Sequence, residues 1–208
     1  MSGLPGVADA NPFSSRFVRP GAIAYAFGPN EAADPLGELS LRILFCPRRR
    51  AAIVGPHGTG KSTLLADLRR RWRLDGLVVA EADAGPGRRP RDLRRDLWLC
   101  RRADVLTVDS FERLDLRGRL LVLLAQRRAG CAVAVTSHRG VRGYEIVHRT
   151  RRTLDVEAAV LADLLRDRPG ECETLLHSPQ WAESRRRRGE NLRESLFDAY
   201  DWIRERSE

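Results

Sequence analysis

Residues 55–62 read GPHGTGKS, which fits the spacing G-x-x-x-x-G-K-[ST], between a short apolar run and a stretch with helical spacing. Gly58 and Gly60 let such a loop curl until successive backbone N–H groups point at phosphate oxygens, and the N-terminus of the following helix adds partial positive charge. Lys61 can then reach the β- and γ-phosphates, and the Ser62 hydroxyl can ligate Mg²⁺. The residues predicted to bind ATP here are Gly55, Pro56, His57, Gly58, Thr59, Gly60, Lys61, Ser62 and Thr63.

Lys61 is the only lysine in a chain that is otherwise rich in arginine. The rigid guanidinium fork of arginine does not fit where a slender ammonium must pass beneath a phosphate chain. The lysine at this one position therefore favours phosphate binding over the alternative, a glycine-rich turn that only caps a helix.

A second motif ends the apolar run at residues 103–109, where Asp109 is predicted to hold Mg²⁺ through water, as an aspartate at a strand tip does in nucleotide-binding sheets. A strand-end turn is the alternative. Ser110 follows, at the position where many hydrolytic ATPases carry a catalytic glutamate. Glu112 could activate water instead if the chain turns there, or it could be a solvated turn residue.

Three polar residues, Thr136, Ser137 and His138, follow the apolar run at residues 131–135. At the carboxyl end of a parallel strand they would lie beside the γ-phosphate, where one of them could orient the attacking water or sense the third phosphate. A polar strand-end turn is the alternative. Upstream of the loop, Tyr25 or Phe27 could stack on a purine, or these rings could anchor the arm to the core.

The alternation of apolar runs and helical stretches predicts an α/β, three-layer fold with a parallel sheet of about five strands and a small helical C-terminal extension. Strands are expected at residues 51–54, 77–80, 103–109, 131–135 and 144–150. Helices are expected at residues 34–46, 62–73, 91–102, 115–129, 154–165 and 171–177 and over most of 181–208, with a turn at 178–180. The expected organisation is a flexible lead-in (1–18), a P-loop domain (19–167) and a helical extension (168–208).

The 208-residue chain has a formal net charge of +9 and a pI near 10.5. A basic surface permits contact with nucleic acid or another polyanion, although an arginine-rich composition accounts for it equally well. The densest positive run, residues 185–188, could grip a phosphate backbone or be a solvated face. Cys46 and Cys131 lie in apolar runs and are predicted to be buried and reduced. With no apolar run long enough to span a bilayer, a cytoplasmic location is expected.

Residues 50–140 together resemble the ASCE division of P-loop NTPases, which includes AAA+ and ABC-type ATPases. No LSGGQ-like stretch follows the loop, which disfavours an ABC transporter ATPase, although His138 stands where those proteins keep a switch histidine. Residues 189–193 (GENLR) resemble the G-x-N-L-R element of AAA+ lid helices. The resemblance implies that Arg193 reaches the γ-phosphate and that Thr136 or Ser137 is the first sensor. The chain is also similar to small uncharacterised bacterial ATP-binding proteins with a V-D-G-[FY]-E-like Walker B motif.

The function predicted from these features is a Mg²⁺-dependent ATPase that couples ATP binding or hydrolysis to a nucleic-acid or protein partner. One alternative is a small-molecule or nucleotide kinase, with residues 85–95 as its acceptor loop. Another is a non-catalytic, ATP-dependent switch whose basic tail docks on nucleic acid or protein, which the serine after Asp109 favours.

Overall fold

The computed structural model describes residues 11–14, 18, 21–28 and 32–207. The lead-in predicted for residues 1–18 lies for the most part outside them. Of that segment, Phe13 and Val18 are buried against the C-terminal helices. Among the described residues, no helix is both long enough and apolar enough to cross a bilayer.

Five parallel strands form one sheet in the order β2-β3-β4-β1-β5. They are β1 (Arg50–Val54), β2 (Val79–Asp83), β3 (Val105–Asp109), β4 (Ala132–Ser137) and β5 (Glu145–Arg149). Because all strands run in one direction, their carboxyl ends meet at one edge of the sheet, which is where ligands bind in such folds. The predicted α/β fold with a five-stranded parallel sheet is confirmed.

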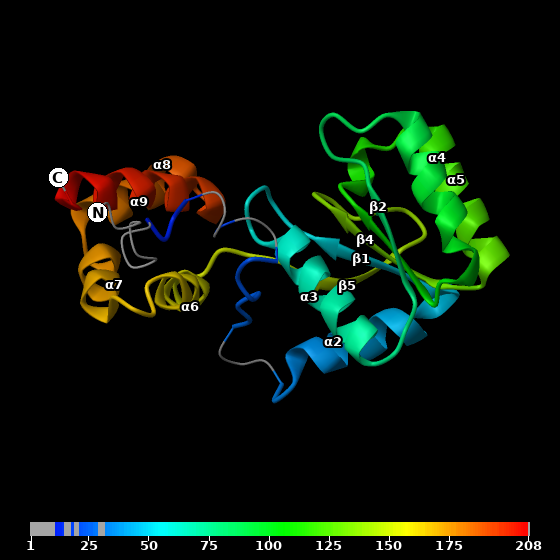
Figure 1. The fold of residues 1–208 in the computed structure, drawn as a ribbon, viewed down its shortest axis with the longest axis horizontal. Coiled ribbons are helices and arrows are strands. Elements are labelled where there is room, and N and C mark those ends of the chain that lie inside the picture. The colour runs from blue at the N-terminus through cyan, green and yellow to red at the C-terminus, as the bar shows by residue number, and fades with distance from the viewer. Residues whose placement is uncertain (1–10, 15–17, 19–20, 29–31, 208) are drawn as a thin grey trace, which may run out of the picture.

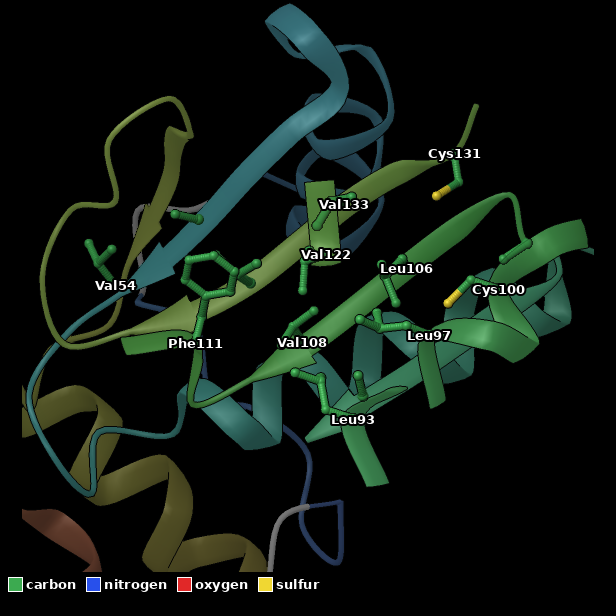
Figure 2. Packing of buried hydrophobic residues seen from close by; sticks show 14 residues of the cluster. Val54, Leu93, Leu97, Cys100, Leu106, Val108, Phe111, Val122, Cys131 and Val133 are labelled. Carbon is green, nitrogen blue, oxygen red and sulfur yellow. The ribbon is translucent and has the colours of Figure 1, made fainter. Parts of the chain in front are cut away.

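Helices cover both faces of the sheet and make three layers (Figure 1). One face carries α2 (Pro35–Phe45) and α3 (Lys61–Leu74), and the other carries α4 (Pro90–Trp98) and α5 (Leu116–Ala129). Successive residues of a strand point to opposite faces, so Ala51 and Ile53 pack toward α2 and α3 while Ala52 and Val54 pack toward α4 and α5. Figure 2 shows the second of these clusters, with Phe111 beside the strands.

Local side-chain hydrogen bonds set the beginnings of the helices. Asp34 Oδ1 accepts a hydrogen bond from Gly37 N (2.9 Å) at the start of α2, and Asp115 Oδ1 accepts one from Gly118 N (2.7 Å) at the start of α5. Each satisfies a backbone N–H that has no partner within its helix. At the other end of α5, Gly130 adopts the left-handed conformation (φ 66°) that commonly ends a helix.

Four helices follow the sheet: α6 (Leu154–Leu164), α7 (Pro169–Leu176), α8 (Pro179–Arg188) and α9 (Leu192–Ser207). They share a third apolar cluster with Phe13 and Val18, apart from the two clusters of the sheet. In Figure 1 this helical part lies to one side of the sheet, beyond α3. The division at residues 167 and 168 stays a prediction, and α6 packs with the helices beyond it.

Three elements differ from the prediction. The helix predicted at residues 91–102 is α4 followed by a 3-10 helix, η3 (Leu99–Arg102). The second strand, predicted at residues 77–80, is β2 (Val79–Asp83), so it begins and ends later than predicted. Ahead of it, Val78 N donates a hydrogen bond to the side chain of Asp104 (Oδ2, 2.8 Å), and Val78 O accepts one from Asp104 N (2.9 Å). The turn predicted at residues 178–180 is the first turn of α8. Ser178 caps it by accepting a hydrogen bond from Trp181 N (3.1 Å).

All four cysteines are buried free thiols, as predicted for Cys46 and Cys131. Burial raises the pKa of the Cys100 thiol to about 12. This thiol therefore stays protonated at neutral pH and packs as a small apolar side chain.

Candidate functional site

The loop between β1 and α3 depends on two glycines in the left-handed region, Gly58 (φ 70°) and Gly60 (φ 90°). Gly60 has a second constraint, because a Cβ atom there would lie 3.1 Å from the ring of Tyr25. The hydroxyl of Thr59 lies 2.6 Å from that of Thr150, which follows β5. The loop is thus held both by its own conformation and by the neighbouring strand.

Lys61 is the first residue of α3, and its ammonium lies inside the loop. Nζ donates hydrogen bonds to the carbonyl oxygens of Gly55 (2.7 Å) and Pro56 (2.5 Å). Burial lowers the pKa of Lys61, and the nearby carboxylates of Glu112 and Asp109 oppose that shift. A cation in this position is surrounded by backbone dipoles and is available to an incoming anion.

Asp109 ends β3 and is oriented by the neighbouring strand. Its Oδ1 accepts hydrogen bonds from Ser110 N (3.0 Å) and from the hydroxyl of Thr136. Thr136 Oγ1 in turn accepts one from Ser110 N (2.9 Å). In the part of the chain that the structure describes, Asp109 Oδ2 accepts no hydrogen bond.

The donors around Asp109 fit Mg²⁺. Ser62 and Asp109 line the same cavity. Among the described residues, no group of three or more His, Cys, Asp or Glu side chains is arranged so that it could hold a metal ion. A hydroxyl and one carboxylate are too few to form a complete cage, but Mg²⁺ is usually bound by one or two protein oxygens together with phosphate oxygens and water.

Ser110 makes the turn that brings Glu112 into the site. Ser110 has φ 58°, a left-handed conformation that is uncommon for a residue with a Cβ atom. The chain then enters the short 3-10 helix η4 (Phe111–Arg113), and Glu112 Oε1 lies 2.9 Å from His138 Nε2. Glu112 Oε2 is buried and has no hydrogen-bond partner among the described residues. One carboxylate oxygen therefore holds the histidine, and the other is an unused acceptor.

His57 and His138 stack at the mouth of the loop. Their ring centroids are 3.7 Å apart, and the ring planes are inclined by 43°. His138 Nδ1 lies 3.3 Å from Gly55 O and 3.5 Å from Lys61 Nζ. Burial, followed by the charges of His138 and Lys61, lowers the pKa of His57. Protonating His57 would place a further positive charge against this cluster.

These groups surround a cavity of about 380 Å³. Of the predicted site residues, the following line it: Tyr25, His57, Gly58, Thr59, Gly60, Lys61, Ser62, Thr63, Asp109, Glu112, Thr136, His138 and Arg193. Glu112 and His138 come from the ends of two neighbouring strands and meet only in the folded chain.

Gly55, Pro56 and Ser137 do not line the cavity. Ser137 is buried, and its carbonyl oxygen accepts a hydrogen bond from Gly55 N (3.2 Å), so it supports the loop from behind. Of residues 85–95, the predicted acceptor loop of a kinase, only Pro86 reaches the cavity.

Tyr25 lines the cavity and is also anchored to the core. Its backbone N donates a hydrogen bond to Asp67 Oδ2 (2.6 Å), and its hydroxyl lies 3.1 Å from His148 Nε2. Phe27 packs edge-on against the Tyr25 ring (4.9 Å between centroids) and does not line the cavity. Of the two aromatic residues, only Tyr25 is placed to contact a ligand.

The apolar end of the cavity was not predicted. It includes Val156 and Val160 of α6 and Leu192 and Leu196 of α9. Their spacing of four residues marks an apolar helix face, but that spacing does not tell what the face covers.

The start of α9 touches the loop. Arg193 N lies within hydrogen-bonding distance of Gly58 O (3.4 Å), and the side chain of Asn191 occupies the space that a Cβ atom on Gly58 would need. The guanidinium of Arg193 lies 5.7 Å from the centre of the Phe197 ring. The predicted sensor arginine therefore borders the cavity and stacks on its own helix.

The run at residues 185–188 is paired within the chain. The ion pairs are Arg185 with Glu157, Arg186 with Glu183, Arg187 with Asp198, and Arg188 with Asp198 and Glu194. Much of the positive charge that the sequence places in this run is neutralised by neighbouring helices.

No known protein family and no curated protein matches this sequence. Solved structures do match in fold. A DNA replication initiation factor has a TM-score of 0.57 at 15% identity, over 81% of this chain and 58% of that one. Domain III of the Thermotoga maritima replication initiation protein DnaA has a TM-score of 0.53 at 14% identity, over 85% of this chain and 94% of that one.

A variant of Thermotoga maritima RuvB has a TM-score of 0.50 at 14% identity, over 70% of this chain and 56% of that one. The chain thus spans little more than half the length of RuvB and of the replication initiation factor. At such low identity the likeness concerns the fold alone: the chain shares the α/β fold, with its parallel sheet between helices, of these three structures.

Proposed function

We propose that this protein is a Mg²⁺-dependent ATPase. The observation that carries the proposal is the geometry of Glu112. Its Oε1 is held by His138 Nε2 at 2.9 Å, while its buried Oε2 has no hydrogen-bond partner among the described residues. A positioned carboxylate with a free acceptor, in the cavity that also contains Lys61, is what water activation requires.

The loop amides and Lys61 would bind the phosphates, with Lys61 exchanging its contacts to Gly55 O and Pro56 O for phosphate oxygens. Ser62 and Asp109 would hold Mg²⁺, which neutralises charge that develops on the phosphate oxygens. The hydrogen bond from Thr136 keeps the Asp109 carboxylate in position for this role.

In the chemical step, Glu112 Oε2 would accept a proton from water as the water oxygen bonds to the γ-phosphorus. The bond from that phosphorus to the β–γ bridging oxygen would break, and the two products would be ADP and inorganic phosphate. His138 would orient Glu112, and Arg193 would approach the γ-phosphate by leaving the Phe197 ring.

The test is phosphate release from ATP with Mg²⁺. We expect Lys61→Ala and Glu112→Gln each to lower the rate on the order of 100-fold or more. Glu38→Gln, an exposed carboxylate on α2, is the matched control and should keep the wild-type rate. Thermal unfolding of each variant would show that a loss of rate is not a loss of fold.

Wild-type turnover in Glu112→Gln would contradict the role of Glu112 and transfer it to Thr136 or His138. ATP binding without turnover would contradict the ATPase assignment and favour the non-catalytic switch, which Ser110 at the usual glutamate position also suits. Phosphate transfer that appears only with an added acceptor would favour a kinase.

We also propose that turnover is coupled to a nucleic-acid or protein partner, since the fold is shared with replication initiation proteins. Stimulation of phosphate release by single- or double-stranded DNA, lost at high salt, would support a nucleic-acid partner. Because residues 185–188 are already paired, we expect their replacement to disturb the C-terminal helices as well as any docking.

A further inference from the structure

The outer side of α5 carries an exposed row of leucines. Leu116, Leu120 and Leu124 are spaced four residues apart, so they share one side of the helix, and they are 83%, 56% and 37% exposed. The opposite side of α5 is accounted for, because Val122 and Gln126 are buried under it. Contiguous exposed apolar side chains of this kind are a feature of interaction surfaces.

An exposed tryptophan lies on the neighbouring helix. Trp98 ends α4 and is 63% exposed, and the 3-10 helix that follows it (Leu99–Arg102) packs against α5. The guanidinium of Arg101 lies 4.7 Å from the centre of the Trp98 ring. In Figure 1, α4 and α5 lie side by side at the side of the sheet away from the C-terminal helices.

Past its N-cap Asp115, α5 carries charge of one sign. Between residues 116 and 129, α5 contains four arginines and no carboxylate. Within the described part of the chain, Arg117, Arg127 and Arg128 are exposed and form no ion pair, in contrast to the paired run at residues 185–188. Three exposed arginines without an ion pair among the described residues therefore lie on the same helix as the exposed leucines.

We propose that the surface formed by Trp98, Leu116, Leu120, Leu124 and the flanking arginines docks an acidic amphipathic helix of a partner protein. The apolar side of such a helix would cover the leucines, and carboxylates at its edges would pair with the arginines. An acidic amphipathic helix would thus cover the exposed leucines and neutralise the arginines beside them.

Other occupants fit less well. A nucleic acid offers phosphates to the arginines but leaves the leucines in water. A second copy of the chain docked through the same face would bring like charges together. A bilayer would have to accept the guanidinium of Arg101, which covers the Trp98 ring, at the depth where that ring inserts.

The test is selection from a display library of 16-residue helices whose apolar side is constant and whose edge positions vary among Glu, Lys and Gln. We expect the selected helices to be acidic at their edges. Their affinity should fall at least 10-fold for Leu116→Gln/Leu120→Gln. The matched control is Leu41→Gln/Phe45→Gln, which changes an exposed apolar pair with the same spacing on α2. In this control the affinity for the selected helices should change less than twofold.

Two variants that each remove two arginines measure the electrostatic contribution to the binding of the selected helices. Arg117→Gln/Arg128→Gln should weaken the selected helices at least fivefold, and Arg42→Gln/Arg70→Gln, exposed arginines on the opposite face of the sheet, should not. Selected helices without an acidic bias, or affinities equal in the α5 and α2 variants, would overturn the proposal. The proposal would also be overturned if no helix is selected. It would be overturned as well if anionic vesicles or duplex DNA bind more tightly than the selected helices and that binding depends on Leu116 and Leu120.

Discussion

The side-chain oxygen of Asn191, at the start of α9, fills the space where a Cβ atom on Gly58 of the phosphate loop would lie. The backbone contact from Arg193 N to Gly58 O (3.4 Å) runs beside it. Gly58 is therefore required twice, once for its φ of 70° and once for the close approach of another helix. Any rearrangement of the loop around phosphate must be accommodated by α9.

Gly58→Ala should separate these two requirements. A left-handed non-glycine residue costs about 1–2 kcal/mol, and the overlap with Asn191 should add about 1–3 kcal/mol. Gly76→Ala is the control, because Gly76 also has a positive φ (80°) but no atom within 4 Å of the added Cβ. The free energy of unfolding in urea measures both variants. Adding Asn191→Ala should recover part of the loss in Gly58→Ala, and equal losses for Gly58→Ala and Gly76→Ala would contradict the contact.

Thr136→Val should lower both stability and phosphate release. The change removes the hydroxyl that donates to Asp109 and accepts from Ser110 N, which leaves buried polar groups unpaired at a cost of about 1–3 kcal/mol. Thr107→Val, on the neighbouring strand β3, removes a comparably buried hydroxyl that bonds Ala80 O away from the cavity. The control should lose stability and keep its turnover. Equal turnover in the two variants would show that Thr136 has no role beyond packing.

Glu157 should be a strong stability determinant. It is 1% exposed and accepts hydrogen bonds from Arg152 (2.6 Å), Arg185 (2.7 Å) and Trp181 Nε1 (3.0 Å), which join α6 to α8. Glu157→Ala leaves the buried guanidinium of Arg152 without its carboxylate partner and should cost about 3–5 kcal/mol. Glu183→Ala breaks only an exposed pair and should cost less than about 1 kcal/mol. Chemical denaturation of the two variants gives the comparison.

The same carboxylate should contribute to acid unfolding. Burial alone would raise the pKa of Glu157, but hydrogen bonds from Arg185 and Arg152 outweigh it and hold the pKa below its ordinary value of 4.5. The unfolded chain therefore takes up this proton first as pH falls. The stability that Glu157 contributes is complete above pH 4.5 and is lost as pH falls through the lower folded value. A Glu157→Gln variant should show a shallower loss of Tm over that range.

His57 should make the stability depend on pH near neutrality. Its pKa is lowered from 6.5, first by burial and then by His138 and Lys61, so the unfolded chain binds the proton more readily than the folded one. Its contribution is therefore complete above pH 6.5 and falls as the solution is acidified. From about pH 7.5 to about pH 5.5 the wild-type Tm should fall more than that of His57→Asn. His177→Asn, at the end of α7, should keep the wild-type slope, and parallel slopes in all three proteins would contradict the prediction.

The phosphate loop could be predicted from sequence because its determinants are local. The spacing of Gly58, Gly60 and Lys61 sets the loop geometry within one strand–helix unit, and an apolar run of a few residues is enough to indicate a buried strand. The five-stranded parallel sheet followed from the repetition of that pattern. The prediction for residues 77–80 was wrong at both ends, because β2 runs from Val79 to Asp83, and the side chain of Asp104, a residue distant in the chain, binds Val78 N ahead of it.

The role of the tail at residues 185–188 shows the limit of local reasoning. As a sequence it is the densest positive charge of the chain, yet Glu157 and Asp198 reach its arginines from other helices. On α5, by contrast, Arg117, Arg127 and Arg128 are exposed and form no ion pair within the described part of the chain. Pairing depends on which helices pack together, and charge order along the chain does not contain that information.

The sequence alone thus determined the strand, loop and helix around residues 55–62, the carboxylate at the end of β3 and the class of fold, since each depends on short-range spacing and on the alternation of strands and helices. Only the tertiary structure decided that Ser110 turns Glu112 onto His138 and that α9 rests on Gly58. Both relationships join residues far apart in the chain, and a left-handed serine has no sequence signal. Their geometry arises only when the carboxyl ends of the strands meet and the C-terminal helices close over them.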